Sequence, residues 1–461
     1  MRFFDFSKIP SFKLNIGQRS YLTYVLILTT VSSLSLGVSI FTNWIISSYF
    51  NINVPGSLMF RGDDGWCNAK DEGFGIHCFG DFNERFNVTE LPHLRAYPNN
   101  LELTPLGPFI TFVANSLASI ANPRSILLLF YFLSICLILL PLIISTWRLP
   151  WIFKILGISV FGIGSYPFLV LIDRLNYLVF AVPLLYFLYS KLDRNDFFSS
   201  GLILILLTAI KPQFCLLVLI FLFRGEKKKF LQIVLSQILF VTGLIVLAGR
   251  GSFSRIFEYI QVASGYAYSE SISAWDLQSR NPPNASLARV FFLIINFFLD
   301  VLGLQNNFDA TFLKHLATSC SLLIFLLIIS LLYFKRHALN DLEIGLILTV
   351  LALLCLGIYV AGYYLVFIIP ILAVFLRRIS FLPHIDGDNF SFNLGFDVAF
   401  KEFVVAFFFS TTTIILPSFS EGILRLPNTN VLEILSPTFA TLAWIIFSIK
   451  LLIKRKINLV R

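Results

Sequence analysis

Charged side chains are scarce in this chain of 461 residues: only 13% are Asp, Glu, Lys or Arg, whereas 57% are hydrophobic. A soluble protein carries about 25% charged residues, so this chain cannot cover itself with a water-solvated surface. Repeated apolar runs of about 17–25 residues, the length that crosses a bilayer, dominate the sequence. The composition therefore excludes an ordinary soluble domain and predicts an all-α polytopic membrane protein.

Nucleotide-binding and metal-binding motifs are also missing from the sequence. There is no Gly-rich phosphate loop, which argues against a primary pump, and there is no CxxC pair. His77 and His93 lie near acids but lack a metal-ligand spacing, so neither a metal site nor a bound cofactor is predicted. The net charge of +9 favours anionic lipid headgroups over nucleic acid as partners, because the Lys and Arg residues stand at the ends of apolar runs.

Twelve apolar segments are predicted to span the membrane. They are residues 21–49, 125–146, 151–172, 175–190, 198–210, 212–224, 230–248, 314–334, 342–360, 362–376, 402–418 and 436–452. Residues 1–20 contain no cleavable signal and are expected to be a cytoplasmic lead-in. With that start, nearly every strong cluster of Lys and Arg falls in a cytoplasmic turn, as the positive-inside rule requires. We therefore expect a multi-pass protein of the plasma or inner membrane with both termini in the cytoplasm.

The whole chain, residues 1–461, is predicted to form one integral-membrane domain with two large extracytoplasmic loops. The first loop covers residues 50–123 and the second covers residues 249–310, whereas residues 381–400 form a cytoplasmic loop. Internal repeats of the transporter kind are not visible in the sequence.

Two further apolar stretches, Thr104–Pro123 and Ser286–Leu304, each follow a long outer loop. A membrane span at either place would reverse the direction of every later segment and move the basic clusters outside. We therefore expect both stretches to be helices that lie along the outer membrane interface or dip into it.

The first outer loop contains an acid-rich stretch, RGDDGWCNAKDEGFGIHCFGDF, at Arg61–Phe82. Asp63, Asp64 and Asp81 are its candidates for a general base that takes the proton from an attacking hydroxyl. The alternative for Asp63 and Asp64 is a solvated turn, because DDG is a strong turn signal.

The six cysteines fall into two groups. Cys67 and Cys78 share the first outer loop, where the environment is oxidising, so we expect a disulfide between them. The others lie in apolar runs and are predicted to be small core residues; they are Cys136, Cys215, Cys320 and Cys355.

Three basic residues on the outer side are candidates for binding a phosphate group, since Lys and Arg stabilise the charge that develops on a departing phosphate. Lys211 lies in KPQ between two short apolar runs, Arg174 lies in DRLN, and Arg280 lies in WDLQSRNPPNAS. The alternative for Lys211 is a snorkelling lysine at a helix break. The alternative for Arg174 is an ion pair with Asp173.

The remaining candidates are predicted to line a pocket for a sugar and its acceptor. Aromatic rings can cover sugar faces, and the polar groups can bind hydroxyls. The residues are Asp173, Asn176, Gln213, Asn284, Ser286, Tyr97, Trp275 and Tyr363. For Asn281–Ser286, the alternative is a turn in which Asn284 or Ser286 caps the next helix. The whole set suits transfer of a sugar from a lipid phosphate, and a membrane-embedded donor explains the missing nucleotide site.

The order of these elements resembles glycosyltransferase family 87, the polyprenol-phosphate-mannose-dependent mannosyltransferases of GT-C architecture. After the first apolar run come the acidic loop, a Pro-rich return (YPNNLELTPLGP, Tyr97–Pro108), DRLN, LLTAIKPQFCLLVLIFLFRGEKKKF, NPPNASL and GYYLVFIIP. Ser199–Phe230 is the most specific match. The resemblance covers residues 20–380, and the last two predicted helices lie outside it.

The resemblance implies a GT-C-like bundle that moves a sugar, mannose first among the candidates, from a polyprenyl phosphate to a hydroxyl of a lipid or glycan on the extracytoplasmic face. It also implies a first-loop Asp as the base and inversion at the anomeric carbon. The chain departs from the family at three places: DFNERF (Asp81–Phe86) has Phe in an aromatic position, Leu175 replaces a frequent Gly, and Thr104–Pro105 replaces Pro-Pro. It therefore resembles a divergent member, whose sugar is not inherited from the family.

Two other function classes remain open at this stage. A lipid-linked sugar transporter or flippase would show repeat symmetry and charges inside several helices, and the chain has few signs of either. A surface-polysaccharide polymerase or ligase would favour an outer site led by Arg or His over one led by acids.

Overall fold

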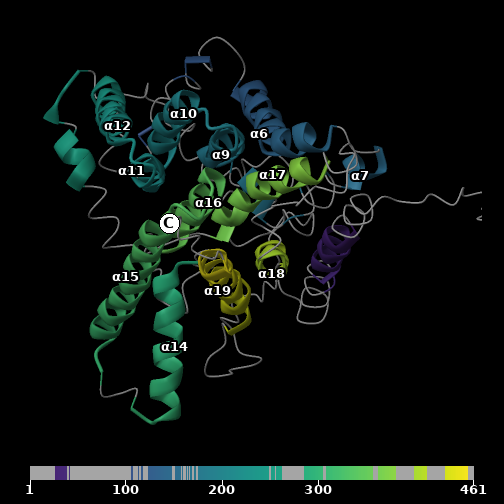
Figure 1. Cartoon of the computed structure of the whole chain (residues 1–461), viewed down its shortest axis with the longest axis vertical. Helices are drawn as coiled ribbons and strands as arrows, with labels where there is room; N and C mark the ends of the chain where they lie inside the picture. Colours follow the sequence, from purple (N-terminus) through teal and green to yellow (C-terminus); the bar gives the residue numbers. More distant parts are fainter. Residues whose placement is uncertain are drawn as a thin grey trace, which may run out of the picture.

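The computed structural model describes the chain from residue 26 to residue 454, with gaps. The described residues are 26–38, 41, 105–106, 113, 116–117, 123–147, 151–156, 158, 162, 165, 167–168, 171–172, 175–248, 251–254, 256–261, 285–304, 308–356, 362–380, 399–412 and 431–454. Every regular element within them is helical, which confirms the predicted all-α class. Figure 1 shows these helices gathered in one bundle.

Three of the described helices are long and apolar enough to cross a membrane: α6 (Pro123–Thr146), α12 (Lys227–Ala248) and α15 (Ala310–Lys335). They agree closely with predicted segments 125–146, 230–248 and 314–334. The membrane character predicted from composition is thus supported. The number of spanning segments, twelve, stays a prediction, because the other apolar helices in the described part are shorter than 18 residues by the same measure.

Further helices cover parts of the remaining predicted segments, and α14 (Leu287–Val301) lies in the predicted interfacial stretch Ser286–Leu304. These helices are the N-terminal helix (Leu26–Val38), α7 (Trp151–Leu156), α9 (Ala181–Leu192), α10 (Phe197–Ile210), α11 (Leu219–Phe223), α14, α16 (Asp341–Leu354), α17 (Ile368–Ser380), α18 (Phe400–Thr411) and α19 (Val431–Lys454). Three 3₁₀ helices join them: η3 (Tyr177–Phe180), η4 (Pro212–Val218) and η6 (Gly362–Phe367).

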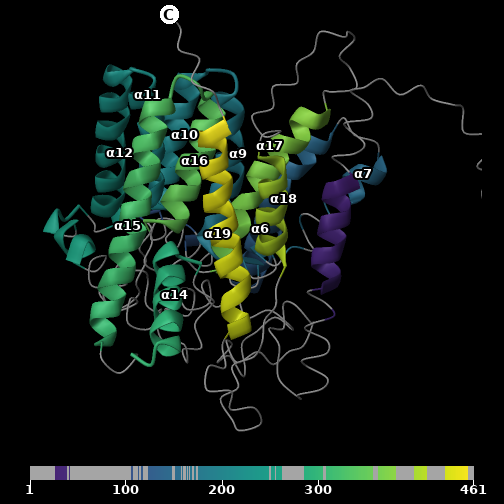
Figure 2. The same cartoon turned by 60° about the horizontal axis from the view of Figure 1, so that its bottom comes forward.

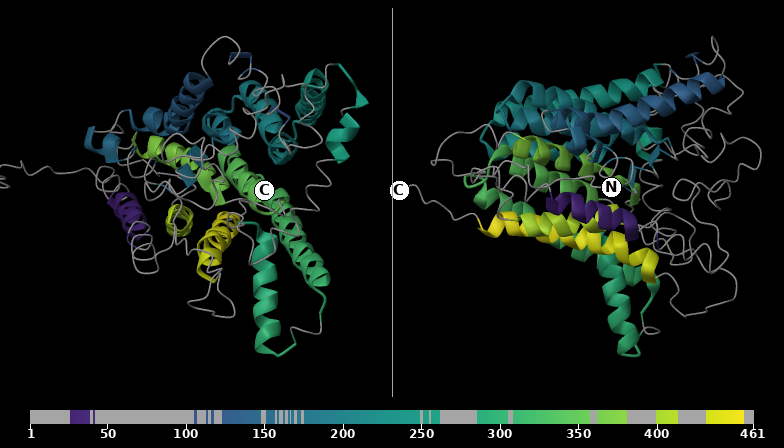
Figure 3. Two further views of the ribbon diagram at one scale, coloured as in Figure 1. Left: turned by 180° about the vertical axis from the view of Figure 1, so that it is seen from behind. Right: turned by 90° about the vertical axis from the view of Figure 1, so that its right-hand side faces the viewer.

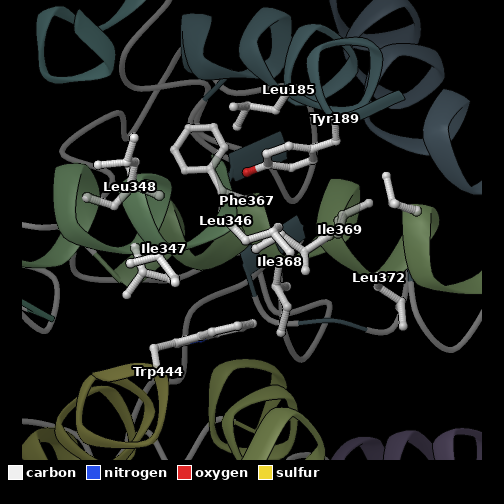
Figure 4. Close-up of a cluster of buried hydrophobic side chains, with 14 of the residues drawn as sticks. Leu185, Tyr189, Leu346, Ile347, Leu348, Phe367, Ile368, Ile369, Leu372 and Trp444 are labelled. Atoms are coloured by element: carbon white, nitrogen blue, oxygen red, sulfur yellow. The ribbon is translucent and has the colours of Figure 1, made fainter. Parts of the chain in front are cut away.

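Helix α16 forms the centre of the bundle. All fourteen of its residues are buried, as expected for a helix that is apolar on every side. It contacts α9, η4 and α19, and Figure 4 shows Leu346, Ile347 and Leu348 of α16 among side chains of α9, α17 and α19. One polar contact crosses this core: the Tyr189 hydroxyl donates to Thr349 Oγ1 at 2.8 Å.

Contacts between turns bring the described basic clusters to one end of the bundle, called here the basic end (upper end in Figure 2). The pairs are Arg224 with Asp341, Arg377 with Ser190, Lys335 with the carbonyl of Ile453, and Lys450 with Glu402. This grouping agrees with the charge asymmetry predicted from the sequence. Its assignment to the cytoplasm stays a prediction.

Helix α14 runs across the direction of α6 and α19 (Figure 3, right). Its Ala288 and Phe292 pack on Leu313 and Ala317 of α15, whereas Phe297, further along α14, is exposed. A crosswise helix with one exposed apolar face is the form predicted for Ser286–Leu304, and its position at a membrane surface stays a prediction. In the other predicted interfacial stretch, Thr104–Pro123, too few residues are described to test its orientation.

The cysteine prediction is partly wrong. Cys355 is buried, as expected for a small core residue, and Cys320 is half-buried, but Cys136 and Cys215 lie on the exposed surface. An apolar run reveals that a segment avoids water, yet when both faces are apolar it does not reveal which face meets the protein. The proposed partners Cys67 and Cys78 lie outside the described residues.

Candidate functional site

The hairpin of α9 and α10 brings two predicted site residues to the same end of the bundle. The two helices pack against each other, joined by a turn in which Asn195 has φ of 55° and Asp196 caps α10 by accepting from Ser199 N–H at 3.1 Å. This turn lies at the basic end, beside Arg377 and Ser190. Asn176, before η3, and Lys211, after α10, therefore both lie at the opposite end, called here the site end.

Three 3₁₀ helices begin at the site end, and each belongs to one of the predicted motifs. DRLN leads into η3, KPQ begins η4, and GYYL begins η6. The rings of Phe214 in η4 and Phe367 in η6 meet edge to face at 5.3 Å, while η3 contacts α10 and η6 contacts α9. A 3₁₀ turn has weaker hydrogen-bond geometry than an α-helix. At membrane depth, irregular backbone is tolerated only where protein buries it or where it lines a cavity.

Lys211 is a buried basic residue at the start of η4. Its backbone is extended, with φ of −144° and ψ of 109°, as expected for a residue before proline. Its N–H donates to Leu207 O at 2.8 Å, and its carbonyl accepts from Phe214 N–H at 3.0 Å. Only 5% of the residue is exposed. Burial of this kind disfavours a snorkelling lysine, whose ammonium group stays in water, and favours a functional role for the charge.

A piece of the first outer loop reaches the same place. Leu106 N–H donates to Ala209 O at 3.0 Å, and the preceding Pro105 is buried. The Pro-rich return that ends at Pro108 is thus hydrogen-bonded two residues before Lys211. The acid-rich stretch that carries Asp63, Asp64 and Asp81 belongs to the same predicted loop but lies outside the described residues.

The DRLN element contains a strained residue. Leu175 has φ of 50°, in the left-handed region that costs an L side chain about 1–2 kcal/mol, and glycine is free of this cost. The family resemblance expects Gly at this position, so Leu175 carries a backbone strain that the expected Gly would avoid. Asn176 then caps η3 by accepting from Leu178 N–H at 3.0 Å.

Two contacts fix the start of α14. Ser286 accepts from Arg289 N–H at 3.2 Å, which confirms the predicted alternative in which Ser286 caps the next helix. Thr441 of α19 donates to Ala285 O at 2.6 Å.

These contacts also place a residue that sequence reasoning missed: Arg289, in the first turn of α14, is only 8% exposed. The sequence does contain a signal for this residue, because Arg289 is the single cation inside the apolar run SLARVFFLII, and a charge in such a run indicates a functional role.

The position at which α16 ends shows how far the site end lies from the ends of the longer helices. Ser321 of α15 donates to the carbonyl of Cys355, directly after α16, at 3.4 Å. Helix α15 begins at Ala310, so it continues for about 16 Å beyond this contact at 1.5 Å per residue. The central helix therefore ends well short of the first residue of α15, and η4 packs against this helix.

The other predicted site residues are only partly placed. Gln213 is half-buried in the first turn of η4, and Tyr363 lies in η6. Most of the set lies outside the described residues: Asp63, Asp64, Asp81, Arg174, Arg280, Asp173, Asn284, Tyr97 and Trp275. Among the described residues, no group of His, Cys, Asp and Glu is arranged to hold a metal ion.

A buried lysine at the start of η4, with Leu106 of the loop return bonded two residues before it, suits the head of an anionic lipid. Comparison with protein-family models, with curated proteins and with solved structures found no match to the chain. The resemblance to glycosyltransferase family 87 therefore stays a prediction that only the sequence motifs support.

Proposed function

We propose that this protein is a membrane glycosyltransferase that moves a sugar, with mannose the first candidate, from a polyprenyl-phosphate donor to a hydroxyl of a lipid or glycan acceptor on the extracytoplasmic face. The observation that carries the proposal is the burial of Lys211 at the site end, where three motif-bearing turns and the return of the first outer loop meet.

Lys211 supports the donor class. An ionisable residue buried in a membrane protein is a candidate for a functional role, and a lysine can bind the phosphate of a lipid that reaches it from within the membrane. The proposal assigns Lys211 to the phosphate, with Arg174 and Arg280 as further candidates. Arg289 joins this group because it too is buried, next to the cap at Ser286.

The proposed reaction is a displacement at the anomeric carbon. An acceptor hydroxyl attacks this carbon, the new C–O bond forms, and the bond to the phosphate oxygen breaks, so that the polyprenyl phosphate leaves with its electron pair. A first-loop carboxylate, Asp63, Asp64 or Asp81, takes the proton of the hydroxyl. Lys211 stabilises the charge gained by the departing phosphate.

The test is an assay of the purified protein in detergent or nanodiscs. Polyprenyl phosphates that carry radiolabelled mannose, glucose or arabinose are incubated with a membrane lipid extract, and products are separated from donors. Label transferred to a new lipid or glycan with one donor supports the proposal. Absence of transfer with all three donors, from protein that is folded and monodisperse, would contradict it for those donors.

The same preparation separates an enzyme from a transporter. In sealed vesicles, a flippase moves the intact donor between leaflets without breaking its sugar–phosphate bond. Movement of unchanged donor, with no transferred label, would replace the glycosyltransferase proposal by a transport function.

A further inference from the structure

The corner of the basic end between α12 and α15 carries excess positive charge. Residues 224–229 and 335–343 contain six Lys or Arg side chains against three Asp or Glu side chains, a net charge of +3. They are close in space because Arg224 donates to the carbonyl of Arg336 at 3.3 Å and the rings of Phe223 and Tyr333 meet at 6.1 Å.

All three acids of this corner are already engaged within the protein. Asp341 pairs with Arg224, Glu226 pairs with Lys229 at 3.3 Å, and Glu343 accepts from Asn340 N–H in the capping box of α16. The remaining cations thus receive no compensation from these carboxylates.

Four cationic groups are left over in this corner. Lys227 and Lys228 are exposed and form no ion pair with any residue that the structure describes. Lys335 and Arg336 donate to the neutral carbonyls of Ile453 and Tyr333, and Arg336 also lies over the Tyr333 ring at 4.1 Å; none of these partners carries a negative charge. Lys227 and Lys228 also stand in the first turn of α12, where the helix dipole disfavours cations, so local helix stability does not account for them.

The surroundings of these cations are apolar and exposed. Leu231 on α12 is 57% exposed and Phe334 on α15 is 73% exposed. Both helices are long and apolar enough to cross a membrane. Lys227 begins α12, and Lys335 ends α15. Positive charge at the ends of two membrane-length helices, above exposed apolar side chains, matches a phosphate headgroup with its acyl chains below.

We infer that the α12–α15 corner is a binding site for an anionic phospholipid, with its headgroup on Lys227, Lys228 and Arg336 and its acyl chains along Leu231 and Phe334. The exposed apolar residues favour a lipid over a nucleic acid, which would leave them in water. The site lies at the opposite end of the bundle from Lys211, so it is independent of the proposed sugar transfer.

The experiment is a lipid titration of the detergent-purified protein followed by native mass spectrometry. Phosphatidylglycerol and phosphatidylcholine with identical acyl chains are compared, and glycerol phosphate serves as the free headgroup without chains. We expect preferential binding of phosphatidylglycerol, weakened by salt, and no retention of glycerol phosphate. Equal binding of the two lipids would overturn the inference, and equal binding of glycerol phosphate would show a free-anion site instead.

Variants locate the site. The double variant Lys227→Gln/Lys228→Gln is expected to lower the affinity for phosphatidylglycerol by about thirtyfold, and Arg336→Gln is expected to lower it to a smaller extent. Lys314→Gln is the matched control, because it removes one charge from the other end of α15. Phosphatidylcholine binding should be the same in all variants, which verifies their folding. Equal losses in the double variant and the control would reject this location.

Discussion

The Arg224 guanidinium donates to the Asp341 carboxylate although the two residues are 117 positions apart in the chain. The same guanidinium donates to the carbonyls of Arg336 and Leu339. One side chain therefore joins the end of α11 to the turn between α15 and α16. Because the Asp341 side chain is 4% exposed, the pair excludes most of the water that would otherwise solvate the carboxylate.

Arg224→Ala is expected to destabilise the protein by about 3–5 kcal/mol, because it leaves a buried carboxylate without its cation. Thermal unfolding in detergent micelles measures this. The matched control is Lys229→Ala, whose pair with Glu226 is exposed and contributes about 0–1 kcal/mol. The double variant Arg224→Leu/Asp341→Leu should be less destabilised than Arg224→Ala. If both single variants had the same midpoint, the buried pair would have no special role.

Lys211→Met removes the buried charge and keeps most of the side-chain volume. We expect kcat/KM with the polyprenyl-phosphate donor to fall by about 10²–10³, as for the loss of one electrostatic group in an active site. Thermal stability is measured on the same preparation, so that a loss of catalysis is separated from a loss of folding. Lys314→Met is the control, and it should leave both quantities unchanged. Full transfer activity in Lys211→Met would exclude a phosphate role for Lys211.

One of the single variants Asp63→Asn, Asp64→Asn and Asp81→Asn is expected to abolish sugar transfer, because an amide cannot take the proton of the acceptor hydroxyl. Expression and membrane insertion should match those of the unchanged protein. Asp309→Asn, at the start of α15, is the control for loss of an acid at the site end. Normal activity in all three first-loop variants would rule out a carboxylate base from this loop.

Leu175→Gly and Leu175→Ala both remove a buried side chain, yet they should differ in stability. Glycine adopts the observed φ of 50° without strain, so the Gly variant is expected to be about 1 kcal/mol more stable than the Ala variant. At Leu185, which is buried within α9, the order should reverse, because glycine is the poorer helix former. Thermal midpoints of the four variants give both differences. The same order at both positions would contradict the left-handed conformation.

Acid should weaken the turn between α9 and α10. Hydrogen bonds from Lys191 and Ser199 lower the pKa of Asp196 to about 2, below its ordinary value of about 3.9. The carboxylate therefore contributes stability that is fully present above about pH 5 and is lost as the pH falls toward 2. Asp196→Asn keeps an N-cap residue and should remove this part of the pH dependence. Unfolding midpoints between pH 2 and pH 7 test this, and identical pH profiles would refute it.

The positions of the helices were largely predictable from the sequence, because apolar length and charge asymmetry report directly on a bilayer environment. Segments 125–146, 230–248 and 314–334 correspond closely to α6, α12 and α15. The segment 175–190 fared less well: Leu175 and Asn176 precede the helix, and η3 forms its first turn. Leu175 gives no turn signal, since leucine rarely adopts a positive φ, and Asn176, which caps η3, is predicted from the sequence to line the sugar pocket and not to begin a helix.

Contacts between helices were beyond the reach of sequence patterns. Gln237 of α12 donates to Thr208 Oγ1 of α10 at 2.8 Å, and Ser35 bonds to Thr411 of α18 at 2.8 Å. Such pairs depend on which faces meet, and helices that are apolar all round give no periodic signal of their buried side. For the same reason, the sequence indicated that Lys211 is functional but did not show that it is buried or that Leu106 is bonded next to it.

The length of the central helix has a consequence for the interior of the bundle. Fourteen residues of α16 extend over about 21 Å, whereas the hydrocarbon core of a bilayer is about 30 Å thick. Because all fourteen residues are buried, the lipid meets longer helices such as α12 and α15, whose Leu239 and Leu323 are exposed, and the short helix causes no hydrophobic mismatch of its own. The difference in length falls inside the protein, so a lipid-linked substrate that binds beyond the end of α16 is expected to lie below the membrane surface.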